Sequence, residues 1–110
     1  MTDITIDAHQ HIWDPGRAVY DWLGPELAPI DGAMNFETLK PHLARAGVDG
    51  TVLVQSADND EDTALMLDVA AANPEILAVV AYAPLERPAD VAVHLDSFRG
   101  NGLIVGVRNL

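Results

Sequence analysis

Three short apolar segments recur at an even interval along this chain, and this repeat constrains its fold more than any other feature. The segments TVLVQ, ILAVVAYA and LIVGV begin near residues 51, 77 and 103, 26 residues apart. Short runs rich in Val and Ile are typical of parallel strands that are covered on both faces. The interval accommodates a strand and a right-handed crossover helix, so the repeat predicts an α/β fold with a parallel sheet.

Helical signals separate these segments. The first predicted helix covers residues 39–46, with Thr38 as its N-cap, Pro41 in its first turn and Gly47 as its end. Two more helices are predicted over residues 61–72, capped by Asn59 or Asp60, and 88–99. A first strand over residues 4–8 completes the order βαβαβαβ. We therefore expect four parallel strands in sequential order, with the helices on one side.

The length and composition limit the classes of protein to which this chain can belong. With 110 residues, the chain is predicted to form one domain, residues 1–110. It carries 17 acidic against 6 basic residues, a formal net charge of −11, which disfavours nucleic acids and anionic membranes as partners. No apolar run reaches the roughly 18 residues of a membrane span, and the first residues do not resemble a secretory signal. We therefore expect a cytoplasmic protein.

The first connection, residues 12–37, is longer than the other connections and contains both tryptophans, Trp13 and Trp22, together with Tyr20. Ligands of parallel α/β folds bind at the carboxyl ends of the strands, where this connection begins. One interpretation is therefore that the aromatic side chains form part of a binding site. The alternative is that they fill a small core of the connection itself. The residues leave both interpretations open.

His9 and His11 follow the first apolar run in the segment IDAHQHIWD. Side chains alternate along a strand, so the two imidazoles emerge on the same side and can reach one divalent cation. The alternative is a pair of polar residues on an exposed strand or turn. Because the chain has no cysteine, any metal site must use His and carboxylate ligands, which suits zinc, manganese or iron.

A family resemblance extends over nearly the whole chain. The segments IDAHQHIWDP, YDWL, VLVQSADNDEDTALML, ILAVVAYAPLERPADV and IVGVRNL resemble, in order, the amidohydrolase-related (amidohydrolase 2) family, which includes sugar lactonases of the L-fuconolactonase and L-rhamnonolactonase type. The resemblance implies the N-terminal half of a (β/α)₈ TIM barrel. It also implies hydrolysis of a sugar-acid lactone or a related acyl bond of a small molecule. Many members, but not all, use a divalent metal, here zinc with manganese as the alternative.

Matched position by position, the resemblance assigns His9 and His11 as metal ligands. It implies substrate-binding roles for four further residues: Trp13, Trp22, Gln55 and Arg108. The forked guanidinium of Arg108 suits a substrate carboxylate or hydroxyl cluster, but an ordinary surface arginine is the alternative. For Gln55, the alternative is a capping hydrogen bond in the loop that follows its strand.

Two departures from the family pattern affect the predicted activity. Asn109 stands where many relatives have a histidine after the Gly-Val-Arg segment. A complete barrel takes about 250 residues, so the general base is expected in a missing C-terminal half, and no catalytic residue is assigned here. We expect the chain alone to be inactive. Two alternatives stay open: a decarboxylase of a small aromatic or unsaturated acid on the same fold, and a non-catalytic half-barrel that self-associates as a homo-oligomer.

Overall fold

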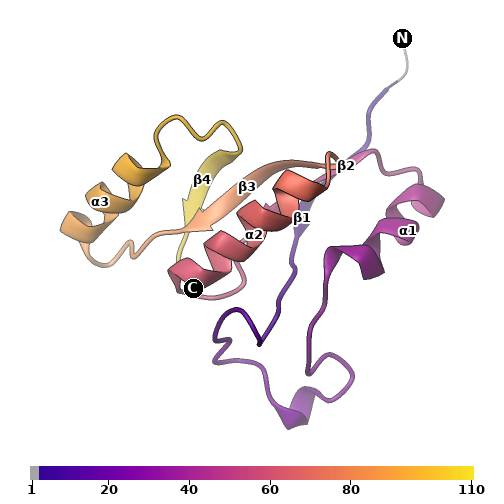
Figure 1. Ribbon diagram of the computed structural model, residues 1–110, viewed down its shortest axis with the longest axis horizontal. Helices are drawn as coiled ribbons and strands as arrows, with labels where there is room; N and C mark the ends of the chain where they lie inside the picture. Colours follow the sequence, from indigo (N-terminus) through magenta and orange to yellow (C-terminus); the bar gives the residue numbers. More distant parts are fainter. Residues whose placement is uncertain (1–2) are drawn as a thin grey trace.

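The computed structural model describes residues 3–110, which form a four-stranded parallel sheet with three α-helices (Figure 1). The elements are β1 (Ile6–Gln10), the 3₁₀ turn η1 (Pro25–Leu27), α1 (Phe36–Ala46), β2 (Gly50–Val54), α2 (Asp60–Ala72), β3 (Ile76–Tyr82), α3 (Pro88–Phe98) and β4 (Ile104–Arg108). The strands lie in the order β1-β2-β3-β4, and every neighbouring pair is parallel. The predicted class, half of a TIM-barrel-like α/β fold, is confirmed.

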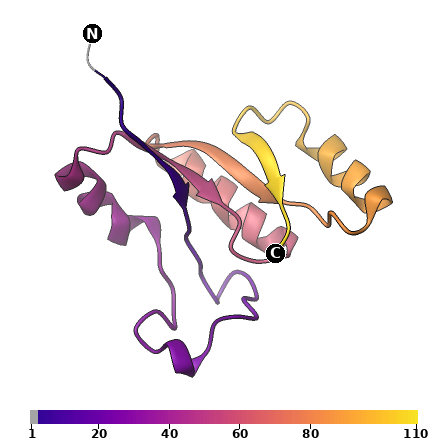
Figure 2. The same ribbon diagram turned by 180° about the vertical axis from the view of Figure 1, so that it is seen from behind.

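The molecule is a slab, with extents of 43 × 41 × 20 Å. Figure 1 shows α2 lying across the sheet, with α1 and α3 towards its two sides. Seen from behind in Figure 2, the strands lie in front of α2 and no described helix passes over them. None of the helices in residues 3–110 is long and apolar enough to cross a membrane. One face of the sheet is thus packed against helix, and the other is open.

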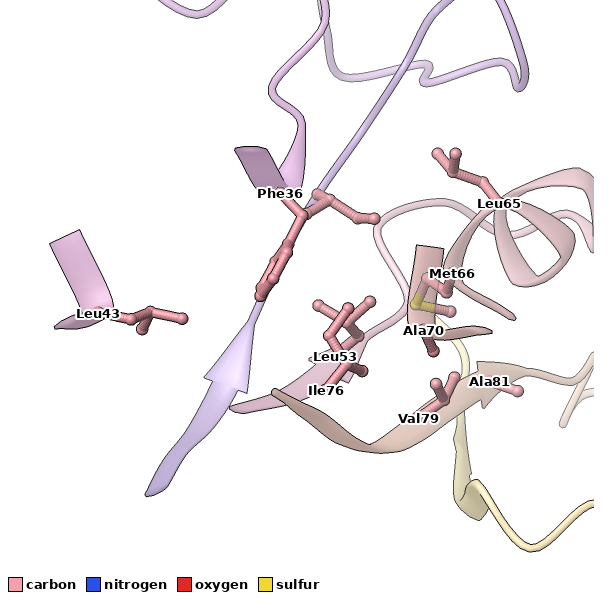
Figure 3. Packing of buried hydrophobic residues seen from close by; sticks show 10 residues of the cluster. Phe36, Leu43, Leu53, Leu65, Met66, Ala70, Ile76, Val79 and Ala81 are labelled. Carbon is pink, nitrogen blue, oxygen red and sulfur yellow. The ribbon is translucent and has the colours of Figure 1, made fainter. Parts of the chain in front are cut away.

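The main core lies between the sheet and α2. Leu53 of β2, Val79 and Ala81 of β3, and Met66 of α2 have no exposed surface. Figure 3 shows these side chains gathered between the strands and the helix. Each large apolar side chain buried in this way stabilises the fold by about 1.5–3 kcal/mol. The core therefore holds β2 and β3, the two central strands, in a fixed position relative to α2.

Helix α1 begins earlier than the sequence indicated. Its N-cap is Asn35, whose Oδ1 accepts a hydrogen bond of 3.1 Å from the backbone N–H of Thr38, so the predicted cap at Thr38 is wrong. The fully buried Phe36 lies in its first turn and anchors this earlier start. Pro41 consequently falls inside the helix. The predicted end is correct, because Gly47 has a φ of 72° in the left-handed region that glycine adopts without strain.

Strand β1 also differs from its predicted range of residues 4–8. It spans Ile6–Gln10, so His9 is part of the strand and does not follow it. The pairing of β1 with β2 shifts register after Asp7. Such an irregularity redirects side chains locally. A prediction based on the regular alternation of side chains along a strand does not include this effect. The start of α2 agrees with the prediction, since the side chain of Asn59 accepts from the backbone N–H of Asp62.

Four valines of β2, β3 and β4 are unequally exposed. Val105 of β4 is 66% exposed, whereas Val52 and Val80 are half-buried. Val54 is buried. Val54 is the last residue of β2. The first connection contacts the loop that follows, where Trp22 Nε1 donates a hydrogen bond of 2.7 Å to the carbonyl group of Ser56.

Candidate active site

His9 of β1 and His11, which follows the strand, converge at the carboxyl end of the sheet. His9 Nε2 and His11 Nε2 lie 3.0 Å apart, and the ring centroids are separated by 4.8 Å. His9 is exposed and His11 is half-buried. The geometric part of the prediction, two imidazoles on the same side of the strand, agrees with the structure. Their role as metal ligands stays a prediction.

The ring of His11 is held through its other nitrogen. Nδ1 lies 2.9 Å from the carbonyl oxygen of Val54 and 3.3 Å from Ser56 Oγ. The Ser56 hydroxyl donates to the carbonyl oxygen of Ile12 at 3.0 Å, so Oγ presents a lone pair to the imidazole. Nδ1 therefore carries the proton and Nε2 presents its lone pair. Burial lowers the pKa of His11, which favours this neutral form. A backbone carbonyl at the distal nitrogen is a common way to orient a metal-binding histidine.

A contact with Arg108 determines the hydrogen-bonding role of His9 Nε2. Arg108 Nη1 lies 3.2 Å from His9 Nε2. A guanidinium group only donates hydrogen bonds, so His9 Nε2 is the acceptor and carries a lone pair as well. The two facing lone pairs on His9 and His11 favour a cation between them.

The separation of the two histidines can be compared with that of ligands on zinc. Two imidazole nitrogens at 2.0–2.1 Å from a tetrahedral zinc ion lie about 3.3 Å from each other. The observed 3.0 Å between the Nε2 atoms of His9 and His11 is close to this value, so the pair fits as two ligands of one ion. No group of three or more His, Asp or Glu residues suitable for a metal occurs in residues 3–110. The described residues therefore supply a partial set of ligands.

The predicted substrate-binding residues line one cavity of about 340 Å³ beside His11. Its walls include Trp13, Trp22, Gln55 and Arg108. The indole rings of Trp13 and Trp22 meet edge to face with centroids 5.1 Å apart. The cavity thus combines aromatic surface, a guanidinium group and an imidazole. This composition suits a small ring compound that carries oxygen substituents.

Tyr20 has a different position from the tryptophans. It is buried and packs with Ala18 and Ala57 in a small cluster, against which Trp13 and Leu23 also lie. The interpretation that the connection forms a small core of its own therefore holds for Tyr20, whereas a binding role of the tryptophans stays a prediction. The connection forms a small core of its own, and that core supports the two tryptophans that line the cavity.

Asp62 is a residue of this region that the sequence analysis did not identify. Its carboxylate has no exposed surface and accepts hydrogen bonds from the Tyr20 hydroxyl at 2.9 Å and the Ser56 backbone N–H at 2.7 Å. Burial raises the pKa of Asp62, while these donors oppose the increase. Asp62 is the third aspartate of the acidic segment SADNDED. Its side chain points inward and connects the first connection to the loop after β2.

Gln55 is fixed in one orientation by its neighbours. Its Nε2 donates to Asp58 Oδ1 at 2.9 Å and to the carbonyl oxygen of Ala57 at 3.3 Å. Both partners are acceptors. If the oxygen and nitrogen of the Gln55 amide were interchanged, the amide oxygen would face two acceptor oxygens. Gln55 Oε1 is buried and has no hydrogen-bond partner among the described residues. A buried acceptor left without a partner is unfavourable, and at the wall of a cavity it indicates a missing donor.

Asn109 links three loops at this end of the sheet. Its Nδ2 donates to Asp58 Oδ2 at 2.9 Å, and its Oδ1 accepts from the backbone N–H of Leu85 at 3.0 Å. Asp58 also accepts from the backbone N–H of Leu110 at 2.8 Å. The departure from the family pattern at Asn109 thus has a structural consequence. Neither Asp58 nor Asn109 was assigned this role from the sequence, because their partners lie far apart along the chain.

Comparisons with known proteins show which enzymes this chain resembles. No family model matches the sequence. The chain is 41% identical over 90 residues to an L-fucono-1,5-lactonase of Burkholderia ambifaria, covering 79% of this chain and 31% of that protein. It is 28% identical over 103 residues to an L-fucono-1,5-lactonase of Burkholderia multivorans, covering 94% of this chain and 34% of that protein. The predicted resemblance to amidohydrolase-related lactonases is confirmed.

Solved structures extend the likeness to the amidohydrolase fold. An amidohydrolase from Burkholderia multivorans with bound zinc has a TM-score of 0.81 and 26% identity, covering 97% of this chain and 37% of its own. Amidohydrolase 2 from Bifidobacterium longum subsp. infantis has a TM-score of 0.60 and 30% identity, covering 74% of this chain and 33% of its own. The chain spans about a third of the length of the lactonases it matches.

Proposed function

We propose that this chain supplies the histidine pair and part of the substrate cavity of a metal-dependent hydrolase that opens a sugar-acid lactone. The observation that carries the proposal is the convergence of His9 Nε2 and His11 Nε2, 3.0 Å apart, beside a cavity with two tryptophans. The similarity to two L-fucono-1,5-lactonases supports the choice of a lactone as the substrate class. Zinc in a related amidohydrolase supports zinc as the metal, with manganese as the alternative.

Each residue has a distinct task in this proposal. His9 and His11 would hold the ion through their Nε2 atoms, and the Val54 carbonyl keeps the His11 ring in place. When bound, the ion supplies Lewis acidity, which polarises a carbonyl group or lowers the pKa of a coordinated water to about 7. The faces of Trp13 and Trp22 contact the apolar side of the sugar ring.

Polar contacts would orient the substrate within the cavity. Arg108 donates hydrogen bonds to a lactone oxygen or to the carboxylate that hydrolysis produces. Gln55 Oε1, which has no partner in the described residues, accepts a hydrogen bond from a ring hydroxyl. No described residue is assigned as the base that takes the proton of the attacking water.

A chimeric enzyme tests the proposal. Residues 1–110 would replace the matching segment of the Burkholderia ambifaria lactonase, and acid release from L-fuconolactone and other aldonolactones would be followed at constant pH. We expect zinc- or manganese-dependent turnover that falls by about 100-fold or more in the His9→Ala and His11→Ala chimeras. The chain alone is expected to be inactive, because a catalytic zinc takes about three protein ligands and residues 3–110 bring together two.

The controls separate a folding defect from a wrong assignment. The parental lactonase establishes that the assay detects ring opening, and His42→Ala gives a matched change at an exposed histidine of α1. A folded chimera that is inactive on every lactone would refute the proposal. Metal-dependent turnover by the 110-residue chain alone, lost in His9→Ala, would refute the argument from the number of ligands.

A further inference from the structure

Arg108 and a metal ion would use the same atom of His9. The guanidinium Nη1 lies 3.2 Å from His9 Nε2, and this nitrogen faces His11 Nε2 at 3.0 Å. A single imidazole lone pair cannot accept a hydrogen bond and coordinate a metal ion at the same time. The guanidinium group of Arg108 and a metal ion would therefore compete for His9 Nε2.

We propose that Arg108 controls metal binding at the His9–His11 pair, so that the ion is held weakly while the guanidinium donates to His9 and more tightly once it is displaced. This inference rests on the proposed role of the histidines as metal ligands. It differs from the predicted role of Arg108 as a substrate contact only, because it makes the same side chain an antagonist of the metal.

Charge reinforces the competition. A guanidinium group remains protonated at all relevant pH values, so its repulsion of a divalent cation is permanent. Within residues 3–110, Arg108 forms no ion pair, whereas Arg17, Arg87 and Arg99 each pair with an aspartate. The positive charge of Arg108 is thus not compensated by a neighbouring carboxylate in the described part of the chain. Its location on β4, next to the site, holds that charge close to any ion between the histidines.

Metal binding to the untagged 110-residue chain tests the inference directly. Zinc would be titrated calorimetrically into the wild type and into the Arg108→Met, Arg108→Gln and Arg108→Lys variants. Arg99→Met is the matched control, because Arg99 is an exposed arginine that pairs with Asp96 on α3. His9→Ala in each background corrects for zinc that binds at the remaining histidines, and circular dichroism establishes that each variant is folded.

We expect Arg108→Met and Arg108→Gln to bind zinc about tenfold or more tightly than the wild type, because each removes a positive charge and frees His9 Nε2. Arg108→Lys should stay within about threefold of the wild type, because it keeps the charge. Arg99→Met should also match the wild type. The increase should disappear when His9 is changed to alanine.

Other outcomes would overturn the inference. Unchanged or weaker zinc binding by both neutral variants would mean that Arg108 does not compete with the metal. An equal gain in Arg108→Lys would exclude charge as the cause, and the absence of binding by every variant up to millimolar zinc would exclude Arg108 as the controlling group. The readout is metal binding alone, so it is independent of whether a chimera hydrolyses lactones.

Discussion

The hydroxyl group of Tyr20 donates a hydrogen bond of 2.9 Å to Oδ1 of Asp62, a carboxylate with no exposed surface. Tyr20 belongs to the first connection and Asp62 to the first turn of α2. The same carboxylate accepts from the backbone N–H of Ser56, whose side chain contacts His11. A single buried acid thus joins the aromatic connection to the loop that holds the histidine.

Removal of the Tyr20 hydroxyl should destabilise the chain. We expect Tyr20→Phe to lower the free energy of unfolding by about 1.5–3 kcal/mol, because it removes a hydrogen bond to a charged and buried group. Urea denaturation followed by tryptophan fluorescence measures the change. Val19→Ala, at a neighbouring position that is 70% exposed, should change the free energy by less than about 0.5 kcal/mol. Equal effects of the two substitutions would contradict the assignment.

Asp58 is expected to order the cavity wall through Gln55 and Asn109. Asp58→Ala removes one acceptor from each of the two side-chain amides and should cost about 1–2 kcal/mol of stability. It should also release the Gln55 side-chain amide, which nuclear magnetic resonance detects as faster exchange of its protons. Asp96→Ala removes an aspartate whose pair with Arg99 is exposed and should leave the Gln55 signal unchanged. An unaltered Gln55 signal in Asp58→Ala would count against this role.

His94 should make the packing of α3 on α2 depend on pH. Its Nδ1 lies 2.9 Å from the Asp90 carbonyl oxygen and its Nε2 lies 2.7 Å from Asp60 Oδ1, and the ring meets Tyr82 and Phe98 edge to face. Both polar partners are acceptors, so both bonds require a doubly protonated ring. The hydrogen bond to the Asp90 carbonyl, followed by the interaction with Asp60, raises the pKa of His94.

The direction of the pH effect follows from the raised pKa. The stabilisation is fully present below the ordinary histidine pKa of about 6.5 and is lost as the pH rises through the higher value of the folded state. We expect the difference in melting temperature between wild type and His94→Gln to shrink by roughly 3 °C between pH 5.5 and pH 8.5. His42→Gln, on α1, is the control. A difference that stays constant or grows with pH would refute the prediction.

The open face and edges of the sheet predict self-association of the isolated chain. Strands β1 and β4 are its edges, and Val105 of β4 is 66% exposed. Light scattering after size exclusion should detect dimers or larger species at about 100 μM, a concentration at which weak interfaces form. Val105→Lys should shift the chain towards monomer, whereas Val19→Lys, in the first connection, should not. A monomer at all concentrations would argue against the half-barrel that self-associates.

Local patterns in the sequence were sufficient for most of the architecture. The strand period places His9 and His11 on the same side, and the structure brings their Nε2 atoms to 3.0 Å. The cap at Asn59 and the end of α1 at Gly47 were also predictable. These features depend on the conformational preferences of a few adjacent residues, and these preferences can be inferred from the sequence alone. The start of α1 was missed because a buried Phe36 decides it, and burial depends on the rest of the molecule.

The connections around the site could be decided only by the tertiary structure. Arg108 and His9 are 99 positions apart, and they meet at the end of the sheet where the parallel strands β1 and β4 both terminate. Asp62 stands in an acidic segment of the sequence, yet it is buried because Tyr20 and the Ser56 backbone supply donors for it. Whether a polar side chain is solvated or buried depends on partners that folding brings from distant segments. The sequence by itself therefore determined the strands, the helices and the histidine pair, while long-range packing decided which charges surround that pair.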